Sequence, residues 1–206
     1  MSRLWVFGDS FSAPYNMQAE WSRKYIEYKG YQPKVFADLL SEKLGYELRN
    51  NAIMGADNYT IFEQFCISFP SFEDNDIVII GWSSYYRFRL VTDAGQWLFL
   101  HPQHENVLTG TKNVSKQTVD EIIVNREAKN YLDELNNWIV FINAIKTKTK
   151  IIQWTPFDMD INVTFLSGYE CLTKETNSQL VNGHFSEKGH KEITEVFLKK
   201  IKNEIL

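Results

Sequence analysis

A serine near the start of the chain and a histidine near its end have the side-chain types that nucleophilic catalysis needs. Ser10 follows the apolar run Leu4–Phe7 within the segment Gly8-Asp9-Ser10, and His184 lies 174 positions further on, before another histidine, His190. A serine hydroxyl is a weak nucleophile until a base about 2.6–3.2 Å away takes its proton. Histidine is the side chain poised to do so near neutral pH. We therefore expect a serine hydrolase in which the two ends of the chain meet.

Acyl transfer also needs hydrogen-bond donors for the oxyanion that develops on the substrate. The N–H of Ser10, expected at a helix start, and the N–H of Gly55 are the candidates, because a glycine permits close approach of the backbone. No metal or other cofactor is expected, since His101 and His104 form a pair without a third ligand.

Three segments resemble the sequence blocks of the SGNH family, also called GDSL-like esterases and lipases. They are Gly8–Ser12, Asn51–Asn58 and His184–His190. The resemblance implies that Ser10 is the nucleophile, that Ser10 and Gly55 supply oxyanion donors, and that His184 is the base. It also implies a flavodoxin-like α/β/α sandwich.

Two departures from the family pattern bear on the chemistry. Ser83 stands where the family has the asparagine that donates to the oxyanion, so its hydroxyl is the candidate replacement. Val181 stands where the family has the aspartate that supports the base. Asn182, Asp158 or a backbone carbonyl is then the candidate support for His184, and an asparagine would fix the tautomer without supplying charge.

Other polar residues near these blocks have both structural and functional interpretations. We expect Asp9 to order the turn before Ser10 rather than to act as a base. Asn58 either stabilises the loop behind Ser10 or belongs to the site. Arg87 either binds an anionic substrate or is solvated, and the second interpretation is favoured.

Alternating strands and helices are predicted to position these residues. The expected strands are Arg3–Phe7, Glu47–Asn51, Asp76–Ile80 and Lys150–Trp154, and the expected helices are Pro33–Leu44, Asp57–Ser68, Lys129–Lys146 and Glu187 to the end. This alternation predicts one domain over residues 1–206, a three-layer α/β/α sandwich with a central parallel sheet. Residues 85–127 are too long for an ordinary connection and are expected to form an inserted loop or lid.

Composition narrows the class of protein further. The net charge is −4 without a basic stripe, which argues against nucleic-acid binding. No charged-then-apolar leader and no long apolar run are present, so we expect no signal peptide, no membrane span and a cytoplasmic or virion-associated protein. The two cysteines do not make a disulfide framework, and Cys66 is expected to be a buried thiol.

Two functions remain open at this stage. The first is an esterase for a small-molecule or glycan ester, such as an O-acetyl group on a carbohydrate. The second is a catalytically weakened or inactive subunit of a larger assembly, for example a virus particle, which the replacements at Ser83 and Val181 would favour. Contact between His184 and Ser10 would favour the first. A flavodoxin-like nucleotide binder ranks below both, because Gly8-Asp9-Ser10 lacks a glycine-rich phosphate cradle.

Overall fold

A five-stranded parallel sheet forms the centre of the protein in the computed structural model, which describes residues 2–85, 87–91, 97–100, 128–180 and 183–203. In spatial order its strands are β2 (Glu47–Asn50), β1 (Arg3–Phe7), β3 (Ile77–Gly81), β6 (Lys150–Thr155) and β7 (Thr164–Phe165). All neighbours pair in parallel, and β1 pairs with both β2 and β3.

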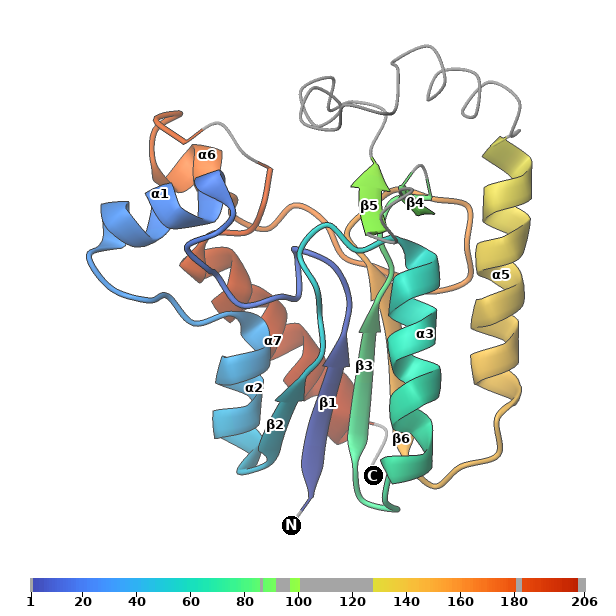
Figure 1. The fold of residues 1–206 in the computed structure, drawn as a ribbon. Coiled ribbons are helices and arrows are strands. Elements are labelled where there is room, and N and C mark those ends of the chain that lie inside the picture. The colour runs from blue at the N-terminus through green and yellow to red at the C-terminus, as the bar shows by residue number, and fades with distance from the viewer. Residues whose placement is uncertain (1, 86, 92–96, 101–127, 181–182, 204–206) are drawn as a thin grey trace.

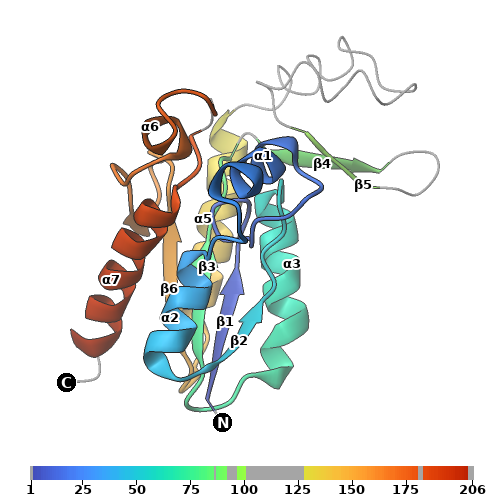
Figure 2. The same cartoon turned by 90° about the vertical axis from the view of Figure 1, so that its left-hand side faces the viewer.

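Helices cover both faces of this sheet, so the predicted three-layer α/β/α fold is confirmed (Figures 1 and 2). The helices within the described residues are α1 (Glu20–Lys29), α2 (Phe36–Leu44), α3 (Asn58–Ser68), the 3₁₀ helix η1 (Phe69–Ser71), α5 (Ala128–Ala144), α6 (Leu172–Glu175) and α7 (Glu187–Asn203). Helices α2 and α7 lie on one face, and α3 and α5 lie on the other.

Side chains along the central strands point alternately to the two faces of the sheet, so the core has two halves. Leu4 and Val6 of β1 pack with α2 and α7, whereas Trp5 and Phe7 pack with α3 and α5. Successive side chains of a strand point to opposite faces, so a strand covered on both sides must be apolar throughout. This explains the uninterrupted run Ile77–Ile80 in β3, every residue of which is buried.

The carboxyl ends of the strands carry additional elements. Figure 1 shows α1, α6 and the two-stranded antiparallel sheet of β4 (Phe88–Val91) and β5 (Trp97–Leu100) at this end of the molecule. The β4–β5 hairpin occupies part of the insertion predicted at 85–127. Residues 101–127, with His101 and His104, lie outside the described residues.

Three expectations drawn from the sequence are corrected here. The helix predicted from Pro33 begins at Phe36, because the Asp38 carboxylate accepts the N–H of Val35 at 3.0 Å and caps the helix there. Ser10 lies in a turn and not at a helix start. Cys66 is exposed and not buried, since the neighbouring Phe65 takes the position that faces the sheet.

Both cysteines, Cys66 and Cys171, are free thiols. Among the helices that the structure describes, none is both long and apolar enough to cross a lipid bilayer.

Candidate active site

Ser10 lies in a tight turn directly after β1. The carbonyl of Asp9 accepts the N–H groups of Ser12 at 3.0 Å and Ala13 at 2.9 Å, and its side-chain Oδ1 accepts the N–H of Phe11 at 3.0 Å. Gly8 is required before this turn, since a Cβ there would lie 2.6 Å from Ser12 Oγ. The turn holds Ser10 at the carboxyl edge of the sheet, where open α/β proteins bind their ligands.

The Asp9 carboxylate is buried beneath this turn and is fully engaged. Its Oδ2 accepts Ser83 Oγ at 2.8 Å and Arg87 Nη1 at 2.8 Å. Such charge-assisted hydrogen bonds are stronger than neutral ones and compensate for the burial of charge. Asp9 therefore orders the turn, and Arg87, expected to be solvated, is instead its ion-pair partner.

Asn58 fixes the backbone of Ser83 through two hydrogen bonds. Its Nδ2 donates to the carbonyl of Ser83 at 3.0 Å, and its Oδ1 accepts the N–H of Ser83 at 2.7 Å. This reciprocal pair joins the start of α3 to the end of β3. The Ser83 hydroxyl hydrogen is meanwhile given to Asp9, so this arrangement does not direct it to an oxyanion.

His184 reaches Ser10 from the other end of the chain. Its Nε2 lies 2.6 Å from Ser10 Oγ, across a sequence separation of 174 residues. The segment that carries it is fixed by hydrogen bonds on both sides. Its own carbonyl accepts the N–H of Leu172 at 2.8 Å, and the next carbonyl, that of Phe185, accepts Tyr15 Oη at 2.7 Å.

Aromatic rings enclose the imidazole of His184. The Trp21 ring stacks on it with a centroid distance of 4.1 Å and an interplanar angle of 11°. The Phe11 ring stacks on it at 4.7 Å and 23°. Trp21 was not expected beside His184, because α1 is largely polar and lies far from His184 in the chain.

Gly55 lies in a loop that runs beside the end of β1. The loop is fixed there because Ile53 N–H donates to the carbonyl of Gly8 at 2.9 Å. Gly55 has a φ of +81°, a left-handed conformation that favours glycine. Within the described part of the chain, neither the N–H of Ser10 nor that of Gly55 donates to another residue, so both are available to a ligand.

The proposed third members of the site differ in where they lie. Asp158 is exposed in the loop after β6 and makes no hydrogen bond or ion pair with another described residue. Asn182 and Val181 lie outside the described residues. No group of three or more metal-ligating side chains occurs where the structure is described.

His190 lies on α7 and packs in the core against the aromatic rings of Tyr15, Phe36 and Phe185. It is 2% exposed, and its Nδ1 has no hydrogen-bond partner among the described residues. Burial lowers the pKa of His190 to about 3, since a charged imidazole is disfavoured in an apolar environment. A packing role fits this position.

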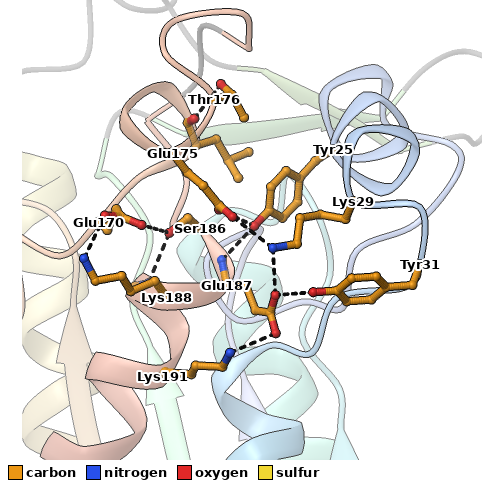
Figure 3. Close-up of polar contacts among 12 residues, drawn as sticks. Tyr25, Lys29, Tyr31, Glu170, Glu175, Thr176, Ser186, Glu187, Lys188 and Lys191 are labelled. Atoms are coloured by element: carbon orange, nitrogen blue, oxygen red, sulfur yellow. Dashed lines mark hydrogen bonds and ion pairs between the residues drawn. The ribbon is translucent and has the colours of Figure 1, made fainter.

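A network of charged and phenolic side chains anchors α1 to the segment that carries His184 (Figure 3). Lys29 Nζ contacts Glu175 of α6 at 3.0 Å and Glu187 of α7 at 2.9 Å. Tyr25 Oη donates to Glu175 at 2.5 Å and accepts the N–H of Glu187 at 2.8 Å. Tyr31 Oη adds a hydrogen bond to Glu187 at 2.6 Å. We call these five residues the α1 anchor.

Ionisation of the anchor follows from its contacts. Burial acts to raise the pKa of Glu187, but hydrogen bonds from Tyr31, Lys29 and Lys191 outweigh it and lower that pKa to about 2. Burial acts to lower the pKa of Lys29, but its hydrogen bonds to Glu187 and Glu175 outweigh it and raise that pKa. Both groups are therefore charged near neutral pH.

Comparison with solved structures found proteins of similar fold. The chain is similar to a carbohydrate esterase whose active site displays divergent catalytic and non-catalytic binding functions, with a TM-score of 0.51 and 9% identity. That match covers 98% of this chain but 65% of the esterase chain.

Two further solved structures cover nearly all of this chain. The psychrotrophic esterase EstA from Pseudoalteromonas sp., inhibited by monoethylphosphonate, matches with a TM-score of 0.49 and 14% identity over 100% of this chain and 99% of its own. A lipase/acylhydrolase from Enterococcus faecalis matches with a TM-score of 0.43 and 13% identity over 99% and 97%. No family model matches the sequence, and no curated protein is similar to it in sequence. The chain has a divergent SGNH/GDSL-like fold.

Proposed function

We propose that this protein is a serine esterase in which Ser10 is the nucleophile and His184 the general base. The contact of 2.6 Å between Ser10 Oγ and His184 Nε2 carries the proposal. It lies within the range in which a base takes the proton of a hydroxyl. It also joins two residues from opposite ends of the chain at the edge of the sheet where α/β proteins have their sites.

The reaction follows from these two groups. Ser10 Oγ attacks the ester carbonyl carbon while its proton passes to His184 Nε2. The tetrahedral intermediate collapses, the C–O bond to the alcohol breaks, and His184 returns the proton to the departing alcohol. Water then attacks the acyl-serine with His184 again as base, which releases the acid and restores Ser10.

Backbone groups are the proposed donors for the oxyanion. The N–H groups of Ser10 and Gly55 donate to no other described residue, and Gly55 has no Cβ to hinder the approach of a ligand to its amide. The Ser83 hydroxyl is given to Asp9 and is not counted as a donor. Because one lost donor costs about 10²–10³ in rate elsewhere, a modest turnover is expected.

Small-acyl esters are the proposed substrates, with O-acetyl groups on carbohydrates as the leading class. The residues that resemble the GDSL-like blocks and the fold shared with a carbohydrate esterase support this class. The alternative is a weakened or inactive subunit of a larger assembly. The hydrogen bond from Ser83 to Asp9 favours the inactive subunit, whereas the contact between Ser10 and His184 favours the esterase.

Hydrolysis of p-nitrophenyl acetate and labelling by a fluorophosphonate test the proposal. We expect both in the wild type and neither in Ser10→Ala. Ser12→Ala is the matched control, because Ser12 is a buried serine in the same turn whose Oγ has no hydrogen-bond partner in the described part of the chain. Labelling that persists in Ser10→Ala would exclude Ser10 as the nucleophile, and a folded wild type without turnover or labelling would favour the subunit.

A further inference from the structure

The imidazole of His184 is held between two aromatic rings that come from different elements. Trp21 of α1 stacks at 4.1 Å and Phe11 of the Ser10 turn at 4.7 Å. Two nearly parallel rings at these distances cannot share one face of an imidazole. Trp21 and Phe11 also make no ring contact with each other, so they lie on opposite faces and leave the ring edge to face Ser10.

Each of these rings is fixed by further contacts. Phe11 meets Phe157 edge-on at 5.4 Å and Phe185 edge-on at 5.0 Å. Trp21 meets Tyr15 edge-on at 5.9 Å. The α1 anchor holds the helix that carries Trp21 against α6 and α7, as Figure 3 shows. The two rings are thus supported independently of His184.

We propose that Trp21 and Phe11 act as positioning residues that orient His184 and stabilise its imidazolium when it takes the proton of Ser10. This inference rests on the proposed esterase function and names further residues that serve it. The pair would supply part of the orientation and charge stabilisation that the GDSL-like resemblance assigns to an aspartate, at whose position this chain has Val181.

The chemistry of the rings supports this role. The faces of indole and benzene rings carry negative charge density, so a cation stacked within about 6 Å is attracted, most strongly by tryptophan. Neutral imidazole gains much less from the same contact. The stabilisation therefore appears when the proton is transferred, which is when it accelerates the reaction.

Charged groups on the elements next to His184 form ion pairs with one another. Asp9 pairs with Arg87, and Glu187 pairs with Lys29. On α1, Glu20 pairs with Lys24. Further ion pairs on these elements are Glu175–Lys29, Glu170–Lys188, Arg23–Glu27 and Lys191–Glu187, and Asp158 is exposed.

An NMR titration of the His184 ring in ¹³C,¹⁵N-histidine-labelled protein tests the proposal directly. Trp21→Leu keeps an apolar side chain over the imidazole but removes the π face. We expect the pKa of His184 to fall by about 0.5–1.5 in this variant. In Trp21→Tyr, the pKa of His184 should lie between the values in the wild type and in Trp21→Leu. The NMR signal that disappears in His184→Gln is the signal of His184. Trp138→Leu is the matched control, because Trp138 stacks on Phe62 at 5.3 Å and 10° without touching His184.

Kinetics add a second measurement that simple loss of packing would not reproduce. The acidic limb of the kcat/KM profile should move to lower pH in Trp21→Leu, and the plateau should fall about threefold to thirtyfold. Phe11→Leu should shift the acidic limb and lower the plateau in the same way, and it replaces Trp21→Leu in the test if that variant does not fold.

The outcomes separate this inference from the function on which it rests. A pKa of His184 that stays unchanged or rises in folded Trp21→Leu and Phe11→Leu would overturn the inference, since relief of burial would then dominate. Ser10-dependent hydrolysis in the same proteins would leave the esterase intact. A lowered pKa without hydrolysis by the wild type would support the aromatic stabilisation and overturn the esterase.

Discussion

At the residue scale, the Asp9 carboxylate next to Ser10 joins three separate groups through hydrogen bonds. Asp9 is 1% exposed and binds the Phe11 amide, the Ser83 hydroxyl and the Arg87 guanidinium at once. Burying a carboxylate without partners is costly, whereas a carboxylate with charged and neutral donors is tolerated. Through Asp9, the Ser10 turn and the segment after β3 are fixed to each other.

Asp9→Asn should therefore destabilise the protein as well as the site. Loss of the charge leaves Arg87 without its buried partner, and we expect the free energy of unfolding to fall by about 3 kcal/mol in urea denaturation. In a double-mutant cycle, Asp9→Asn should cost much less in an Arg87→Met background. Equal costs in both backgrounds would mean that the ion pair contributes nothing.

Residue types and spacing were sufficient to select Ser10 and His184, which the structure brings to 2.6 Å. Their roles remain proposals. The sequence did not predict the pairing of Arg87 with Asp9 or the position of Trp21, because both depend on how elements distant in the chain pack together. The sequence also did not predict that the Ser83 hydroxyl donates to Asp9, because that hydrogen bond depends on how the two segments pack.

At the element scale, α1 matters because it is attached to the His184 segment and to little of the sheet. Ser22 and Tyr25 are its buried residues, so apolar burial alone holds it weakly. The α1 anchor compensates, since Lys29 joins α1 to both α6 and α7 through partly buried carboxylates. The position of Trp21 thus depends on a polar network.

Lys29→Met should loosen α1 while leaving the central sheet intact. We expect a loss of about 1–2 kcal/mol in stability, because two charge-assisted hydrogen bonds disappear in a partly solvated site. Hydrogen exchange should quicken in α1 before it does in β1 and β3. Lys24→Met, which removes an exposed pair with Glu20 on the same helix, should change neither measurement. Equal effects of the two variants would contradict the anchor.

The main strands and helices of the central fold were predicted from the sequence, and several short or polar elements were missed. The strand Arg3–Phe7 has the predicted bounds. Helix α3 was predicted from Asp57 and begins at Asn58, because Asp57 caps the helix and accepts the N–H of Thr60 at 2.8 Å. Helix α1 was not predicted, because half of its residues are charged and its apolar residues do not form a clear stripe. Strand β7 was missed because a strand of 2 residues has no periodicity to detect.

At the scale of the whole molecule, the core contains a buried histidine, His190, that makes no ion pair with another described residue. His190 lies between aromatic rings on the α2 and α7 side of the sheet and has a pKa of about 3 because it is buried. An unfolded chain would bind a proton on this histidine near its ordinary pKa of about 6.5. Protonation therefore favours unfolding as the pH falls from about 6.5 towards 3, and it has no effect above 6.5.

His190→Phe should remove this part of the acid sensitivity. Between pH 6.5 and 4, the wild type should lose up to about 1.4 kcal/mol of stability per pH unit through His190, on top of the contribution of carboxylates such as Glu187. The variant keeps those carboxylates, so the difference between the two stability curves isolates His190. Urea denaturation at pH 7, 6, 5 and 4 measures that difference. It should grow in favour of His190→Phe as the pH falls, and parallel curves would show that His190 is protonated in the folded protein as readily as in the unfolded chain.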